Sequence, residues 1–123
     1  MTQSLEDYLE TIYLVVRDKN VARVKDISER MNVKKPSVIH ALKELGDRGF
    51  IVHEKYGYIE LSEAGKSEAE KIFETHTLLK NFLLKILGVS EETAENDACQ
   101  MEHVVSQETL NKIKNIVKTQ VKI

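Results

Sequence analysis

Apolar residues recur with the period of an α-helix through the first 50 residues. Over residues 4–18 they stand three or four apart, at Leu5, Tyr8, Leu9, Ile12, Tyr13 and Val16. Two shorter segments keep the same period. One centres on Ile27, and the other begins near Pro36, which suits a first helical turn, and ends at Gly49. This pattern predicts three successive helices.

The period then changes. In residues 51–62, IVHEKYGYIELS, apolar and polar residues alternate on both sides of Tyr56-Gly57, which predicts a β-hairpin. Helical spacing returns afterwards and continues to the C-terminus. Serines that suit helix N-caps introduce three more helices, at Ser62, Ser90 and Ser106. Gly88 suits the end of the first of these, which is the longest.

This order of elements predicts a mainly α protein. An N-terminal winged helix-turn-helix, of three helices and a β-hairpin wing, precedes an all-helical dimerisation domain. We place the junction within the long helix, so that the domains span residues 1–64 and 65–123. The later helices carry more apolar residues than so short a segment can bury alone, including Phe73, Leu78, Leu79, Phe82, Leu83, Ile86 and Leu87. A homodimer would cover some of them, while others must form an ordinary intrachain core.

Composition adds little to this picture except through charge. No apolar run among the 123 residues is long enough to cross a membrane, and the single cysteine cannot form an intrachain disulfide. We therefore expect a cytoplasmic protein with no membrane partner. The net charge of -2 hides an asymmetry. Residues 23–55 carry eight Lys or Arg against five acids, whereas residues 86–111 carry six acids and no Lys or Arg. The first segment suits a polyanion and the second a cation.

Basic residues gather on the second helix of the helix-turn-helix pair, away from its apolar stripe. Such an arrangement lets the apolar side dock on the domain while the other side enters the major groove of double-stranded DNA. Lys34 and Lys35 suit phosphate contacts, and Ser37 and His40 can reach base edges. The candidate DNA-contacting residues, on this helix and on the hairpin, are Lys34, Lys35, Pro36, Ser37, His40, Lys43, His53, Lys55 and Tyr56. A small α+β unit that binds protein is the alternative.

Potential metal ligands cluster near the C-terminus. Cys99, Glu102 and His103 stand at positions i, i+3 and i+4 of a predicted helix, and so share one face. Thiolate, carboxylate and imidazole groups all bind transition metals. Taken singly, a cysteine is more often a small buried hydrophobe and a histidine a structural residue. Further candidates stand elsewhere: Asp7 and Glu10 on one face of the first helix, His76 on the long helix, and Glu95 one turn before Cys99.

Several motifs together give the chain a family resemblance. They are EDYLETIY, ARVKDISERMNVKKPSVIHALKELGDRGFI, HEKYGYIELSEAGK, THTLLKNFL and NDACQMEHVVS. With them the chain resembles the diphtheria-toxin-repressor family of metal-dependent transcriptional repressors in its short, two-domain, manganese-regulator form. The resemblance implies a homodimer whose metal site joins the N-terminal helix to the dimerisation domain. It also implies a set of metal ligands, which are Asp7, Glu10, His76, Cys99, Glu102 and His103, with Glu95 as a further candidate.

The resemblance is mixed in its details. Asp7 and Glu10 are similar to the manganese branch, whereas Cys99 is similar to the iron branch. Lys80 stands where relatives tend to place a carboxylate, and Glu95 where the iron branch has a histidine. Because a thiolate shifts preference away from Mn²⁺, we expect Fe²⁺ first and Mn²⁺ next, with Co²⁺, Ni²⁺ or Zn²⁺ able to substitute.

We therefore expect a metal-responsive repressor in which a divalent ion is the corepressor for operator binding, without a small-molecule substrate. A winged-helix regulator with a structural metal, or with a different effector, is the main alternative. A metal- or thiol-dependent enzyme is remote, because Cys99 and His103 lack a third orienting group and no HExxH signature is present.

Overall fold

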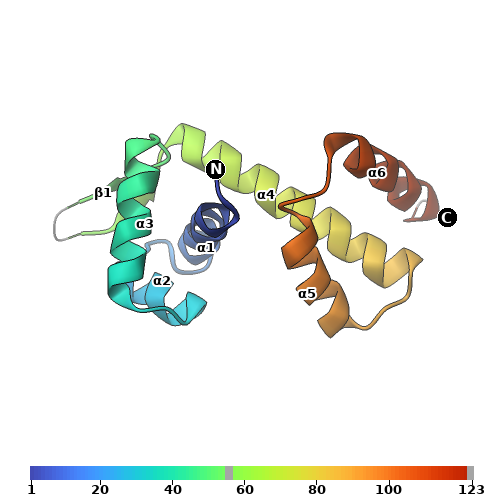
Figure 1. Ribbon diagram of the computed structural model, residues 1–123, viewed down its shortest axis with the longest axis horizontal. Helices are drawn as coiled ribbons and strands as arrows, with labels where there is room; N and C mark the ends of the chain where they lie inside the picture. The colour runs from blue at the N-terminus through green and yellow to red at the C-terminus, as the bar shows by residue number, and fades with distance from the viewer. Residues whose placement is uncertain (55–56, 122–123) are drawn as a thin grey trace. The chain divides into compact units, whose positions relative to one another are not determined.

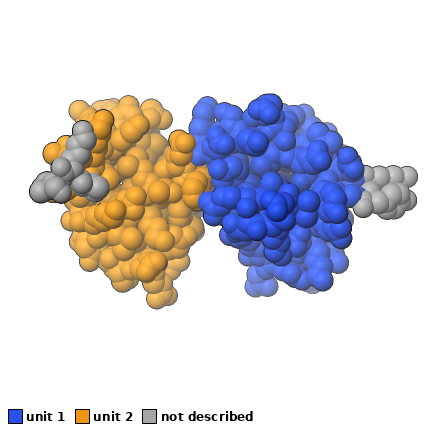
Figure 2. Space-filling model, turned by 180° about the vertical axis from the view of Figure 1, so that it is seen from behind, with its two compact units in different colours: residues 1–71 blue, residues 72–123 orange. Residues whose placement is uncertain are grey.

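The computed structural model describes residues 1–54 and 57–121. Within them the chain forms six α-helices, one π-helical segment and a two-stranded antiparallel sheet (Figure 1). In chain order these are α1 (Gln3–Lys19), α2 (Val24–Met31), α3 (Lys35–Asp47), β1 (Ile51–His53), β2 (Ile59–Leu61), α4 (Glu63–Asn81), η1 (Phe82–Ile86), α5 (Glu91–Met101) and α6 (Gln107–Val121). They divide into unit 1, Met1–Lys71, and unit 2, Ile72–Ile123 (Figure 2). The division falls within α4.

Helix α1 buries one face in unit 1. The hydroxyl of Thr2 caps its start by accepting a hydrogen bond from the Leu5 amide at 3.2 Å. Asn20 ends it in the left-handed conformation, and its amide donates to the Val16 carbonyl at 2.8 Å. The buried residues are Leu5, Tyr8, Leu9, Ile12 and Val15. The expected amphipathic helix is present, with Val15 in the core where the sequence had suggested Val16.

Helices α2 and α3 form the helix-turn-helix. Asn32 makes the turn between them with a φ of 55°, a value that asparagine tolerates better than most residues. The Ser28 hydroxyl donates to the Val33 carbonyl at 2.6 Å and closes the turn. On α3, Val38, Leu42 and Leu45 are buried, as their spacing predicted. The opposite face of α3 is thereby left to solvent.

The hairpin completes a winged helix. Strands β1 and β2 pair antiparallel, with Ile51 opposite Leu61 and His53 opposite Ile59. Ile51 and Ile59 are buried, which fastens the hairpin to the helices, and the Ile59 amide donates to the Ala22 carbonyl at 2.8 Å. The predicted mainly α fold with an N-terminal winged helix is therefore confirmed.

Unit 2 contains the second half of α4 together with η1, α5 and α6. Its core consists of Leu79, Leu83, Ala94, Ala98 and Ile113. The long helix does not run uniformly to Gly88, as the sequence suggested: it changes to π-helix at Phe82, and the Leu87 amide donates to the Phe82 carbonyl at 3.2 Å. The wider turn keeps Leu83 in the core. Gly88, with a φ of 71°, then ends the helical run.

The C-terminal end of α5 also differs from the expectation. The helix ends at Met101 instead of continuing through Val104. The amides of both Val104 and Val105 donate to the Met101 carbonyl at 3.0 Å, which tightens the chain into a turn. No helix in the described part of the chain is both long and apolar enough to span a bilayer.

Candidate metal centre and DNA interface

His76 lies at the centre of a cluster of side chains in unit 2 whose types can bind a metal ion. It projects from α4 between two carboxylates: its Nδ1 is 3.0 Å from Glu102 Oε2, and its Nε2 is 3.0 Å from Glu95 Oε2. The imidazole is 12% exposed and the Glu102 side chain 1% exposed. Packing of α4 against α5 thus holds an imidazole and two carboxylates together from positions 19 and 26 residues apart.

The thiol of Cys99 joins the same cluster. Its Sγ is 3.9 Å from His76 Nδ1 and 3.8 Å from Glu95 Oε1. One ligand atom from each of His76, Glu95 and Cys99 lies within 4.8 Å of the other two, a spacing that can hold a single metal ion. Glu95, which was predicted only as a further candidate ligand, is therefore a full member of the cluster.

Proton binding at His76 reflects its position between the two carboxylates. The hydrogen bond to Glu102, supported by the one to Glu95, outweighs burial and raises the pKa of His76 to about 9. At neutral pH the metal-free cluster therefore contains an imidazolium whose two N–H groups donate to Glu102 and Glu95. The His76 imidazolium thus balances negative charge on Glu95 and Glu102 that a bound metal ion could balance instead.

Lys80 provides a second internal cation one helical turn after His76. Its Nζ is 3.1 Å from Glu95 Oε2 and 3.8 Å from Glu91 Oε1. The hydrogen bond to Glu95 raises the pKa of Lys80. Burial opposes ionisation of Glu95, but the hydrogen bonds from Lys80 and His76 lower its pKa overall. Glu95 is thus a carboxylate shared between two donors.

Glu102 and His103 are placed by the turn that ends α5. The sequence expectation that both lie within the helix is wrong, because α5 ends at Met101. Glu102 is its C-cap and keeps helical backbone angles, so the i, i+3 relation to Cys99 still directs its carboxylate to His76. Its Oε1 lies 3.4 Å from His103 Nε2 and, among the described residues, is buried without a hydrogen-bond partner. Such an orphaned carboxylate oxygen suits a metal ligand.

Asp7 and Glu10 belong to unit 1. They lie one turn apart on α1, and both are partly buried. The other expected ligands, His76, Cys99, Glu102 and His103, belong to unit 2. The grouping of these two acids with the unit 2 cluster stays a prediction.

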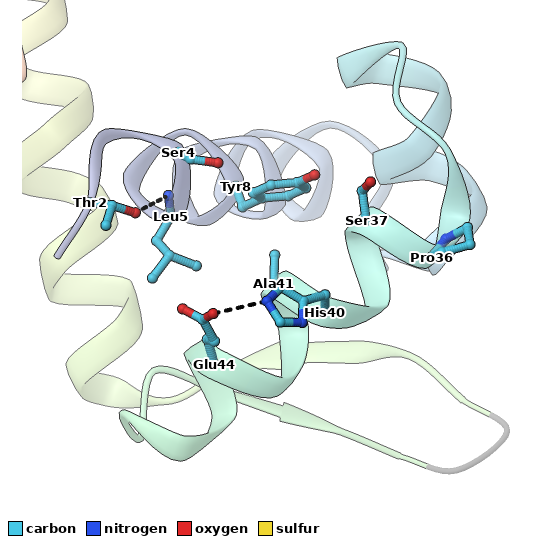
Figure 3. Close-up of a pocket in the computed structure, with 9 residues that line it drawn as sticks. All are labelled: Thr2, Ser4, Leu5, Tyr8, Pro36, Ser37, His40, Ala41 and Glu44. Carbon is cyan, nitrogen blue, oxygen red and sulfur yellow. Dashed lines mark hydrogen bonds and ion pairs between the residues drawn. The ribbon is translucent and has the colours of Figure 1, made fainter.

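The candidate DNA-contacting residues within the described ranges are all exposed. They are Lys34, Lys35, Pro36, Ser37, His40, Lys43 and His53, while Lys55 and Tyr56 lie outside the described residues. The imidazole of His40 is oriented by its own helix, since its Nε2 lies 3.1 Å from Glu44 Oε1. Pro36, Ser37 and His40 also line an open pocket of about 550 Å³ between the start of α1 and α3 (Figure 3).

Ile39 is a feature of this face that the sequence did not single out. Its side chain is 54% exposed, although isoleucine is normally buried. Lys35 and Lys43 stand four residues before and after it, so all three share the solvent face of α3. Ile39 stands outside the four-residue spacing of the buried Val38 and Leu42. That position could have identified it from the sequence as an exposed isoleucine.

Family models match nearly the whole chain. The model described as the iron dependent repressor N-terminal DNA binding domain matches residues 1–59, and that of the iron dependent repressor metal binding and dimerisation domain matches residues 62–120. The chain belongs to the iron-dependent repressor family. This confirms the resemblance to the diphtheria-toxin-repressor family, whose members are metal-dependent transcriptional repressors.

Relatives within the iron-dependent repressor family agree. An uncharacterised HTH-type transcriptional regulator of Methanocaldococcus jannaschii is 39% identical over 115 residues, which cover 93% of this chain and 92% of that protein. The HTH-type transcriptional regulator MntR of Lysinibacillus sphaericus is 36% identical over 116 residues, covering 94% and 83%. Both are transcriptional regulators, not enzymes, so the comparisons give no support to a catalytic role for Cys99.

Solved structures of metal-dependent regulators share the fold. The metal-dependent transcriptional regulator MtsR superposes with a TM-score of 0.86 at 28% identity, over 96% of this chain and 55% of that one. The manganese regulator SloR superposes with a TM-score of 0.82 at 26% identity, over 96% and 55%. The chain therefore spans about half the length of these solved relatives.

Proposed function

We propose that the chain is a metal-responsive transcriptional repressor in which a divalent ion promotes binding of a homodimer to operator DNA. The observation that carries this proposal is the His76 cluster in unit 2, where an imidazole, a thiol and two carboxylates converge in a chain that belongs to a repressor family. The proposed ligands are His76, Cys99, Glu102 and His103 of unit 2 and Asp7 and Glu10 of unit 1, with Glu95 as a further candidate.

The cluster has the properties that a divalent transition metal requires. Its donors are of the nitrogen, sulfur and oxygen types that such ions bind, and the buried Glu102 Oε1 has no hydrogen-bond partner among the described residues. When bound, a divalent ion supplies two positive charges and a fixed coordination geometry. His76 and Cys99 give up their protons to act as ligands.

The switch that we propose rests on charge. In the metal-free state the His76 imidazolium and the Lys80 ammonium already balance the charges of Glu95 and Glu102, so unit 2 offers no surplus positive charge to attract the Asp7 and Glu10 carboxylates of α1. With an ion shared between the units, Asp7 and Glu10 become ligands and the winged helix is held at one distance from its copy in the dimer. A preference of a few kcal/mol for that state is enough to shift the population substantially.

The geometry of α3 supports the DNA-binding half of the proposal. Lys34 and Lys35 at its start neutralise phosphates and position the helix. Ser37 and His40, on the exposed face, contact base edges in the major groove. Glu44 holds the His40 imidazole in one orientation through Nε2. In that orientation the remaining ring nitrogen is presented to the DNA.

The exposed Ile39 adds an apolar contact to this face. We propose that it reads the 5-methyl group of a thymine. Replacing Ile39 by Ala is expected to weaken specific binding about fourfold, since a buried methyl-sized group contributes roughly 0.8 kcal/mol. A duplex selected by the wild-type chain from a random pool provides the test. Uracil in place of the contacted thymine should weaken the wild-type chain and leave Ile39→Ala unchanged; equal sensitivity of both chains would contradict the contact.

Metal dependence itself is tested by comparing chelated and metal-loaded protein on the selected duplex. Fluorescence anisotropy should show at least tenfold tighter binding with Fe²⁺, added under anaerobic conditions, or with Mn²⁺. Far-UV circular dichroism on the same samples should show unchanged helix content, because the His76 imidazolium already joins Glu95 and Glu102 without metal. Equal DNA affinity with and without metal would contradict the proposal. Unfolding on chelation would favour a structural metal instead.

The choice of ion is part of the proposal. Cys99 supplies a thiolate, which favours Fe²⁺ over Mn²⁺, while the surrounding carboxylates keep Mn²⁺ acceptable. The relative SloR is a manganese regulator, and the family models are named for iron. Co²⁺, Ni²⁺ and Zn²⁺ fit the same donors and should activate in vitro.

A further inference from the structure

The Lys80 ammonium lies directly beside the ligand cluster and is paired with one of its members, Glu95. Glu95 Oε2 is 3.1 Å from Lys80 Nζ and 3.0 Å from His76 Nε2, so one carboxylate oxygen bridges the two cations. The Lys80 side chain is 28% exposed, and it also reaches Glu91 at 3.8 Å. His76 and Lys80 stand four residues apart on α4, and both point towards α5.

The charges of the cluster balance with one divalent ion and this ammonium. Once Cys99 is a thiolate, unit 2 supplies three negative charges, from Cys99, Glu95 and Glu102. One divalent ion replaces the proton of His76 and contributes two positive charges, and Lys80 contributes the third. Glu91 is 82% exposed, so solvent screens its charge. The proposed ligands Asp7 and Glu10 of unit 1 add two negative charges to this sum, so the limit on a second ion rests on the position of the Lys80 ammonium beside Glu95.

We propose that Lys80 acts as a built-in cation in the place of a second divalent ion beside Glu95, and limits the chain to one bound ion. This inference rests on the proposed metal-binding function and concerns the number of ions. The reason is geometric as well as electrostatic. The ammonium already uses Glu95 Oε2, and it would repel a divalent ion placed a few ångströms away in a partly desolvated site.

The proposal predicts what happens when the ammonium is removed. In Lys80→Glu a carboxylate replaces it between Glu91 and Glu95, and three carboxylates with the nearby Cys99 thiolate form a donor set for another ion. In Lys80→Gln the cation is lost but no ligand is gained. A second ion should therefore bind both variants, at least tenfold more weakly in Lys80→Gln.

The test measures stoichiometry on the full chain. Chelated protein is dialysed against Co²⁺ under anaerobic conditions, and cobalt per chain is determined by elemental analysis. We expect one ion in the wild type and two in Lys80→Glu. The control Lys85→Glu makes the same charge change at an exposed position of η1 and should keep one ion. Repulsion from Glu91 and Glu95 could unfold Lys80→Glu, and circular dichroism would show this. In that case the stoichiometry is measured on Lys80→Gln at high cobalt concentration.

The outcomes separate this inference from the function on which it rests. Two ions in the wild type, or a single ion in every Lys80 variant that folds, would overturn the role of Lys80 and leave metal-dependent repression standing. A wild-type chain that binds no ion would overturn both. One ion in the wild type and Lys85→Glu, with two in the Lys80 variants, would support it.

Discussion

Replacing Glu102 by Gln is expected to abolish the metal response of DNA binding. The substitution keeps the size of the side chain but removes the charge of a carboxylate that is 1% exposed and lies 3.0 Å from His76 Nδ1. We expect metal affinity to fall by at least roughly 100-fold, about 2.7 kcal/mol, since even partners that only orient a ligand account for 10- to 100-fold. Calorimetric titration with Mn²⁺ and anisotropy on the selected duplex measure the two effects.

A matched control separates the effect of changing position 102 from the general effect of losing one negative charge. Glu92→Gln removes one negative charge from the same helix, at an exposed site in its first turn, and should leave metal affinity and DNA binding unchanged. Wild-type metal activation in Glu102→Gln would exclude Glu102 from the site. A loss of activation in Glu92→Gln of equal size would attribute the effect to overall charge.

Metal affinity is expected to rise steeply with pH. Because hydrogen bonds to Glu102 and Glu95 raise the pKa of His76 to about 9, metal binding at neutral pH must displace a proton from that ring. His76 alone then gives about a tenfold gain in affinity per pH unit below pH 9, or about 100-fold between pH 6 and pH 8. Deprotonation of Cys99 adds to this slope. Titration calorimetry in buffers of different ionisation enthalpy counts the released protons.

The same pKa shift sets the pH dependence of metal-free stability, with the opposite sign. A raised pKa in the folded state stabilises the fold below the ordinary pKa of 6.5, and this contribution is lost as the pH rises towards about 9. Chelated protein should therefore unfold at lower urea concentration at pH 9 than at pH 6.5. His53→Gln, on the wing, should retain both dependences, whereas His76→Gln should lose the pH dependence of stability and the part of the affinity slope that His76 supplies. A pH-independent metal affinity in the wild type would contradict the expected displacement of a proton from His76 on metal binding.

The winged helix could be read from the sequence because its elements are specified locally. The three-and-four spacing of Val38, Leu42 and Leu45 fixed which face of α3 is buried, and the alternation around the hairpin fixed the wing. Long helices with clear caps gave the rest of the element order. The exposure of Ile39 was not predicted, because an exposed isoleucine differs from a buried one only by its position on the helix.

The metal cluster was less predictable because tertiary packing assembles it. Sequence spacing grouped Cys99 with Glu102, but nothing local indicated that Glu95 and Glu102 would hold opposite nitrogens of His76. The π-helical turn at Phe82 was not signalled either, since its residues fit an ordinary helix. The end of α5 at Met101 depended on backbone bonds that no residue type marks. For the His76 cluster, the sequence identified the residues and left their arrangement open.

The imidazolium between Glu95 and Glu102 has a consequence for the speed of the response. Hydrogen bonds between these side chains hold α4 and α5 together while His76 keeps its proton, so the proposed switch does not require unit 2 to fold around an incoming ion. We expect loading to be an exchange in which a proton leaves and a hydrated cation sheds water. The lag between a rise in metal concentration and occupancy of this cluster should then be set by ligand exchange.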